Sequence, residues 1–151
     1  MPSNPHPTGA EARRMADLLS AYGEIKASRY CEILVAAALG GEVMPPTFPG
    51  YDVRCPRLGR VQVRMRIKGT DGPNPRISFR GEPADFDVLV AVHLDADFGV
   101  HKALAIPVAA VLPHYARRKQ GTGLAHVPWA DLVVDPSAED ITGRLSAALK
   151  V

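Results

Sequence analysis

The 151-residue sequence has only two cysteines, Cys31 in a helical pattern and Cys55 in a strand pattern. A disulfide framework needs more cysteines than this, and a cysteine-based zinc site needs three or four. We therefore expect a cytoplasmic protein without structural disulfides.

Long apolar runs and a strong charge of one sign are also missing. No stretch approaches the ~18 apolar residues that cross a bilayer, so the sequence predicts no membrane partner. Residues 1–9, rich in Pro, Asn and His, lack the apolar core of a signal peptide and are expected to form a mobile tail. The formal net charge is only +2, so any nucleic-acid binding must come from a local patch.

The remaining residues, 10–151, have the composition of one soluble domain, with 46% hydrophobic residues. Apolar spacing predicts helix over residues 10–39, where Gly23 either separates two helices or lies within one, and Gly40-Gly41 ends it. The elements expected after it are a hairpin over 50–68, strands at 76–80, 86–94 and 100–106, a helix over 107–119, an extended piece at 129–134, and a last helix through 141–149 capped by Ser137 and Asp140. This order predicts an α/β domain with a mixed sheet of about four to five strands flanked by helices.

The clearest pattern is the strand over residues 60–68. Apolar and polar residues alternate in it, namely Val61, Val63, Met65 and Ile67 against Gln62, Arg64, Arg66 and Lys68. One face therefore packs on a core, while the other carries an amide and three cations. Because such polar rows also occur on solvated edge strands, the row is either a functional face or a solvated edge.

The position of Asp52 depends on the hairpin register. If residues 56–58 form a three-residue loop closed by Gly59, Asp52 lies opposite Gln62 on the same face. A two- or four-residue loop pairs Asp52 with Val63 instead. The phase of the neighbouring apolar residues favours the first register, and the sequence alone leaves both open.

A second acid, Glu32, occupies an unusual place in its helical pattern. On a helical wheel its neighbours are Ser28, Val35, Ala36 and Leu39. A carboxylate among small and apolar groups is costly unless it is paired or binds a cation. The alternative is a surface glutamate paired with Arg29, one turn back.

Together these segments resemble the PD-(D/E)XK nuclease superfamily, which has the restriction-endonuclease-like fold. The similar segments are Tyr30-Cys31-Glu32, Gly50-Tyr51-Asp52-Val53, and residues 60–66, which resemble the family's Gln-Val-Lys-x-Arg variant of its acid–x–Lys motif. The strand at 86–90 and the hairpin after it fit the same core order. The resemblance covers roughly residues 23–112.

The resemblance implies a site and a partner. It implies Glu32, Asp52 and Gln62 as ligands of Mg²⁺, or of Mn²⁺, and Asp52, Gln62 and Arg64 as catalytic residues. It also implies nucleic-acid contacts, to double-stranded DNA, from Arg66, Lys68, Arg76 and Arg80. Arg64 stands where the family has a lysine. Arginine does not exchange a proton near neutral pH, although it holds a phosphate bidentately.

Three hypotheses follow. The first is a DNA-acting endonuclease that hydrolyses phosphodiester bonds with Mg²⁺. The second is a degraded member of the fold that binds nucleic acid or a protein partner without cleavage, and the third is a small structural α/β protein. A homodimer is left open.

A separate candidate metal site involves two histidines. A turn centred on Asp97 places His93 opposite His101 with Asp95 nearby, a donor set for zinc or a late transition metal. A cross-strand histidine pair without metal is the favoured interpretation.

Overall fold

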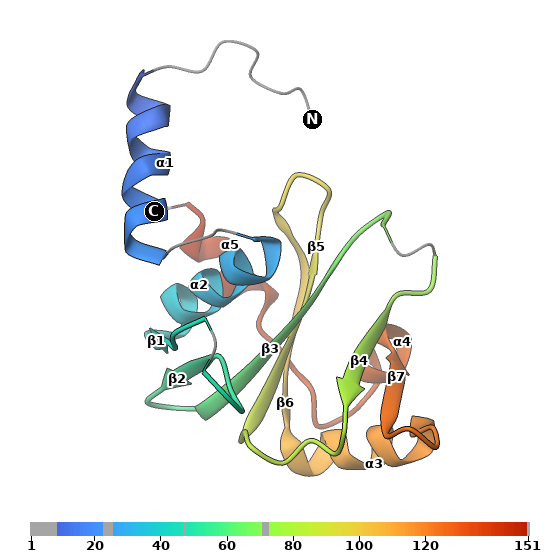
Figure 1. Cartoon of the computed structure of the whole chain (residues 1–151). Coiled ribbons are helices and arrows are strands. Elements are labelled where there is room, and N and C mark those ends of the chain that lie inside the picture. The colour runs from blue at the N-terminus through green and yellow to red at the C-terminus, as the bar shows by residue number, and fades with distance from the viewer. Residues whose placement is uncertain (1–8, 23–25, 47, 71–72, 151) are drawn as a thin grey trace.

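The computed structural model describes residues 9–22, 26–46, 48–70 and 73–150 (Figure 1). Its elements, in chain order, are α1 (Gly9–Tyr22), α2 (Ala27–Leu39), β1 (Glu42–Val43), β2 (Val53–Cys55), β3 (Gly59–Ile67), β4 (Arg76–Arg80), β5 (Val88–Leu94), β6 (Val100–Pro107), α3 (Val108–Arg118), β7 (Leu124–Pro128), α4 (Trp129–Val133), β8 (Glu139–Asp140) and α5 (Thr142–Ala148). The predicted helix over 10–39 is two helices, while Gly23 itself and most of the expected tail lie outside the described residues.

The fold is mixed α/β and is built on a six-stranded mixed sheet in the order β1-β2-β3-β5-β6-β8. Neighbours are antiparallel except β3 and β5, which run parallel. The expected four to five strands were too few because β1 and β8 have two residues each, too short to show a period. β4 lies on the connection between the parallel strands and pairs with β7 in a separate two-stranded sheet.

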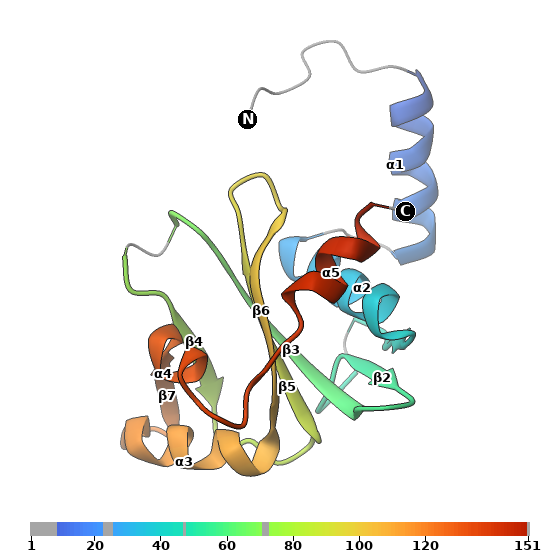
Figure 2. The same cartoon turned by 180° about the vertical axis from the view of Figure 1, so that it is seen from behind.

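The six-stranded sheet separates two apolar cores. Figures 1 and 2 show α2 and α5 on one face, and α3, α4, β4 and β7 on the other. Val61, Val63 and Val90 pack with α2 and α5, whereas Leu89 and Ile106 pack with the second group. β5 is buried on both faces, as its continuous apolar run predicts. No helix among the described residues is long and apolar enough to cross a bilayer.

The β2–β3 hairpin has the three-residue loop. Val53 pairs with Val61, and Cys55 pairs with Gly59, which confirms the register that sets Asp52 opposite Gln62. Gly59 has φ +80°, and a Cβ there would lie 2.6 Å from an Asp87 carboxylate oxygen. Glycine is therefore favoured at this position by its conformation, and any side chain there would also displace the Asp87 carboxylate.

Two local predictions near the C-terminus were wrong. Residues 129–133 form helix α4 instead of an extended piece, since Pro128 ends β7 and the helix is too short to show a 3.6-residue period. The capping box is also out of register. Asp140, not Ser137, lies at the start of α5, where its Oδ1 accepts hydrogen bonds from the Thr142 amide at 2.9 Å and the Thr142 hydroxyl at 2.6 Å.

The packing of α5 on the sheet is open to a direct test. Leu145 is fully buried in the core shared by α2 and α5, so Leu145→Ala should lower the free energy of unfolding by about 2–5 kcal/mol. Leu149 is 44% exposed, so Leu149→Ala should change it by about 0.5 kcal/mol or less. Denaturant unfolding measures both, and equal effects would contradict the packing of α5.

Candidate functional site

Asp52 lies immediately before strand β2, at the point beyond which β3 is no longer paired with β2. β2 pairs with β3 only as far as Val61, while β3 runs on beside β5 to Ile67. The amide of Asp52 donates to the Val61 carbonyl at 2.9 Å. Its Oδ2 accepts the Val63 amide at 2.8 Å and Nε2 of Gln62 at 2.9 Å. The Asp52 side chain thus replaces the next hydrogen bond of the ladder, and it is held against Gln62.

Helix α2 brings Glu32 and Arg29 to the same place. Arg29 is only 8% exposed, and its Nη1 donates to Oε1 of Glu32 at 2.9 Å and to the Met44 carbonyl at 2.7 Å. The Met44 amide in turn donates to the Asp52 carbonyl at 2.8 Å. Glu32 is therefore paired with Arg29, as one of the two interpretations predicted, but its side chain is 18% exposed rather than on the open surface.

The polar face of β3 is directed toward β4. Nε of Arg64 donates to the Ser78 carbonyl at 3.4 Å, a long contact, and Nε of Arg66 donates to the Arg76 carbonyl at 2.6 Å. Both arginines are half-buried, whereas Lys68 is exposed. At Arg64 and Arg66 the row is therefore not a fully solvated edge.

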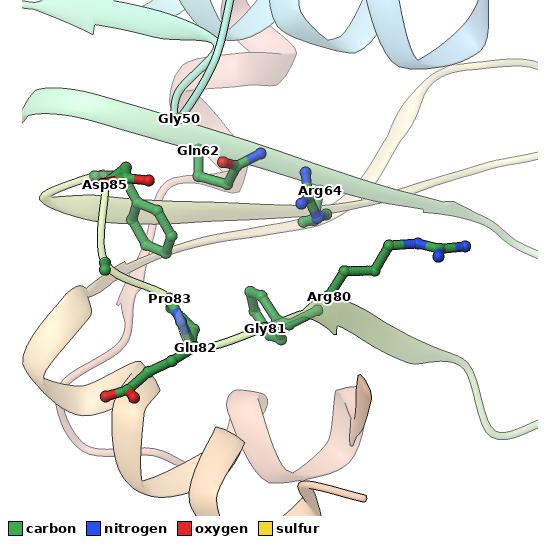
Figure 3. Close-up of a pocket in the computed structure, with 11 residues that line it drawn as sticks. Gly50, Gln62, Arg64, Arg80, Gly81, Glu82, Pro83 and Asp85 are labelled. Carbon is green, nitrogen blue, oxygen red and sulfur yellow. The ribbon is translucent and has the colours of Figure 1, made fainter. Parts of the chain in front are cut away.

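A cavity of about 150 Å³ lies beside this face. Its lining includes Gln62, Arg64 and the loop from Phe79 to Phe86. Figure 3 shows Gln62 and Arg64 on β3, with Arg80 at the end of β4 and Asp85 on the loop that follows it. Glu32 and Asp52 are not among the lining residues, so the cavity adjoins the two acids without including them.

We call Arg29, Glu32, Asp52, Gln62 and Arg64 the polar cluster. Its two carboxylates and two guanidinium groups make it formally neutral. Burial raises the pKa of Glu32, while the hydrogen bond from Arg29 lowers it and the Asp52 charge raises it. Burial also raises the pKa of Asp52, whereas the hydrogen bond from the Val63 amide and the charges of the two arginines lower it. Burial lowers the pKa of Arg64, although both carboxylates raise it. The carboxylates and guanidinium groups of the polar cluster therefore interact in a partly desolvated environment.

The structure brings some of the expected site residues together and leaves others apart. Glu32, Asp52, Gln62 and Arg64 lie in the polar cluster, whereas Lys68, Arg76 and Arg80 are exposed. Arg29 was predicted only as an alternative partner of Glu32, and its burial within the site was missed. Its one signal was its position three residues before an acid, in a helix with a largely apolar face.

The histidine pair differs from its expected register. A β-bulge between His93 and Leu94 pairs His93 with Lys102 instead of His101, although the two imidazole rings still lie edge to face at 5.3 Å. Within the described residues there is no group of three or more His, Cys, Asp or Glu side chains that could hold a metal ion.

The donor atoms of the polar cluster fit a hard divalent cation. Glu32, Asp52 and the Gln62 amide offer oxygen ligands, which Mg²⁺ prefers, and no sulfur or imidazole. One oxygen of Glu32 is already bonded to Arg29. A cation bound between the two acids therefore competes with a guanidinium for Glu32.

Two comparisons, with protein-family models and with curated proteins, find no match for this chain. The nuclease resemblance therefore rests on the residues of the chain alone.

The raised carboxyl pKa values predict a pH dependence. A raised pKa means that the folded protein binds the proton more tightly than the unfolded chain does. The contribution of Glu32 to the free energy of unfolding is therefore highest below its ordinary pKa, and it falls as pH rises through the raised value. Glu32→Gln lacks this contribution. The free energy of unfolding of the variant, relative to that of the parent, should therefore increase as pH rises from the ordinary pKa of a glutamate through the raised pKa of Glu32. Parallel curves for parent and variant in denaturant unfolding would contradict the burial effect.

Proposed function

We propose that the protein acts on DNA as a restriction-endonuclease-like enzyme that hydrolyses phosphodiester bonds with Mg²⁺, or with Mn²⁺. The observation that supports this most is the convergence of Asp52, Gln62 and Arg64 at the start of β2. Glu32 is connected to them through Arg29 and the Met44 backbone. Helix α2, the residue before β2 and strand β3 thus supply the acids, the amide and the cation of the proposed site.

The order of elements is compatible with this proposal. A helix with an acid, α2, comes before a hairpin, β2–β3, with an acid at its entry and a polar row on its second strand. The next strand of the six-stranded sheet, β5, is parallel to β3. Restriction-endonuclease-like architecture is part of the proposal and is supported by this order.

The residues of the polar cluster have distinct roles in the proposed reaction. A bound Mg²⁺ supplies a Lewis acid and a water of lowered pKa. Glu32 and Asp52 would hold the ion, and Gln62 would add a neutral oxygen while it orients Asp52. Arg64 would bind the phosphate oxygens and stabilise their developing charge. Because arginine stays charged near neutral pH, Arg64 acts by charge and not by proton transfer.

Exposed cations near the polar cluster would bind the rest of the nucleic acid. Lys68 follows the polar row at the end of β3, Arg76 and Arg80 lie at the two ends of β4, and Arg80 also borders the cavity beside Gln62. Such side chains contact phosphates regardless of base sequence, and they fix where the duplex lies. Arg66, already bonded to the β4 backbone, would add a half-buried charge.

A second function, DNA binding without cleavage, is favoured by one observation. Arg29 neutralises Glu32, and Arg64 occupies the position of the proposed catalytic cation, so the site is charge-balanced without a metal. Binding requires only the cations, whereas cleavage also requires that a metal displaces Arg29 from Glu32.

The first test is cleavage of plasmid DNA with Mg²⁺ or Mn²⁺. We expect slow metal-dependent nicking by the parent, and its loss in Asp52→Asn, which removes a ligand charge. Arg64→Lys should increase the rate, since lysine is compact and its pKa shifts when it is partly desolvated. Equal nicking by the parent and by Asp52→Asn would identify a contaminant, and the proposed enzyme activity would then be abandoned.

The second test is the salt dependence of DNA binding, measured by mobility shift without divalent cations. Each phosphate contact contributes a slope of about −0.9 in log affinity against log salt. Arg80→Ala should weaken binding and reduce the slope by about 0.9. The control is Arg57→Ala, because Arg57 is exposed and pairs with Glu139 at 3.1 Å, outside the polar cluster. Binding that does not depend on salt, or equal effects of both substitutions, would contradict the proposed contacts between these exposed cations and DNA phosphates.

A further inference from the structure

Arg29 is an unusual buried cation because only part of its guanidinium is satisfied. Within the part of the chain that the structure describes, both of its hydrogen bonds come from Nη1, which donates to Glu32 and to the Met44 carbonyl. Nε is buried and has no hydrogen-bond partner among the same residues. The Tyr22 ring lies 6.0 Å from Cζ, at the limit of a cation–π contact. One nitrogen therefore holds the group in place, and the contact with Glu32 is a large share of what holds it.

The same contact sets the charge that a metal ion would meet. Oε1 of Glu32 lies 2.9 Å from Nη1, so a cation coordinated by that oxygen would lie close to a positive charge. Arg64 is a second cation that interacts with both acids. In a partly buried site such interactions are screened much less than at the surface. A divalent ion therefore meets two acids that are already neutralised.

We propose that Arg29 is an internal competitor of the divalent cation. In the free protein it occupies Glu32, and an ion binds between Glu32 and Asp52 only when the guanidinium leaves Oε1. This inference deepens the proposed function, because it concerns the same site and takes its metal from it. It assigns Arg29 a role in setting metal affinity, beyond that of connecting α2 to the backbone at Met44.

The two roles of Arg29 predict opposite results. If Arg29 only positions Glu32, its removal disorders a ligand and weakens metal binding. If Arg29 competes with the metal, its removal frees a carboxylate oxygen and takes away a repelling charge, so that metal binding becomes tighter. Lysine retains the charge and should therefore resemble arginine in metal affinity.

The experiment is Mn²⁺ titration of the full chain near neutral pH, by calorimetry and by electron paramagnetic resonance of the free ion. Arg29→Gln should bind Mn²⁺ about 10- to 100-fold more tightly than the parent, as expected for removal of one nearby charge at intermediate dielectric constant. Arg29→Lys should stay within about threefold of the parent, since its charge is unchanged. The double variant Arg29→Gln with Glu32→Gln should lose the gain.

A matched control is Arg118→Gln, since Arg118 pairs with Asp131 at the same 2.9 Å on α3 and should leave Mn²⁺ affinity unchanged. Equal or weaker binding by Arg29→Gln would overturn the inference. A gain that survives in the double variant would also overturn it, and so would a lack of Mn²⁺ binding by both the parent and Arg29→Gln.

Because Arg29 is buried, a measurement on the unaltered protein covers the case in which its variants do not fold. Mg²⁺ titration followed by the assigned ¹⁵N resonance of Arg29 Nε should show a shift with the same midpoint as the signals of Asp52. An Arg29 resonance that stays constant while Asp52 titrates would overturn the inference, as would the absence of any shift at Asp52.

The outcome is separable from that of the proposed function. Tighter Mn²⁺ binding by Arg29→Gln, without any DNA cleavage, would support the inference and reject the enzyme activity. Metal-dependent cleavage by the parent, with Mn²⁺ affinity insensitive to Arg29→Gln, would reject the inference alone.

Discussion

The hydrogen bond from the Val63 amide to Oδ2 of Asp52 holds the candidate site together. It replaces a ladder bond just before β2 begins at Val53, where β3 runs on beside β5 with its polar face toward β4. The same carboxylate oxygen accepts from Gln62, and the Asp52 carbonyl connects through Met44 to Arg29 on α2. One acid at the entry of a hairpin thus fixes the relative positions of a strand, a second strand and a helix.

Charge balance is the second constraint on the site. Desolvation penalises each buried ion, and the two acids with the two arginines offset that penalty for one another. Because the polar cluster is neutral, it is stable without a metal ion. This stability lowers its affinity for a metal ion. A phosphodiester beside Arg64 adds a negative charge and would favour the metal, so we infer that metal and nucleic acid bind more tightly together than separately. This coupling is reciprocal.

Much of the site was predictable from local patterns, whereas its surroundings were not. The two-residue period of β3 and the phase of the residues around Asp52 favoured a register in which Asp52 and Gln62 share a face, but they left a second register open, and the structure has the favoured one. The pairing of β4 with β7 was not predictable, since it joins segments almost 50 residues apart and neither carries a sign of its partner. Arg29 was missed because helical spacing shows which residues share a face, but it does not show which charge is buried with an acid. Its burial depends on Met44, which follows the helix at a distance that no period encodes.

The most direct test of the polar cluster as a metal site is an anomalous difference map from crystals grown or soaked with Mn²⁺. We expect a peak within coordination distance of Glu32 and Asp52, with the Arg29 guanidinium moved off Oε1 of Glu32. A map with no peak at these acids, and with Arg29 still bonded to Glu32, would contradict the metal site and leave nucleic-acid binding without hydrolysis as the remaining function.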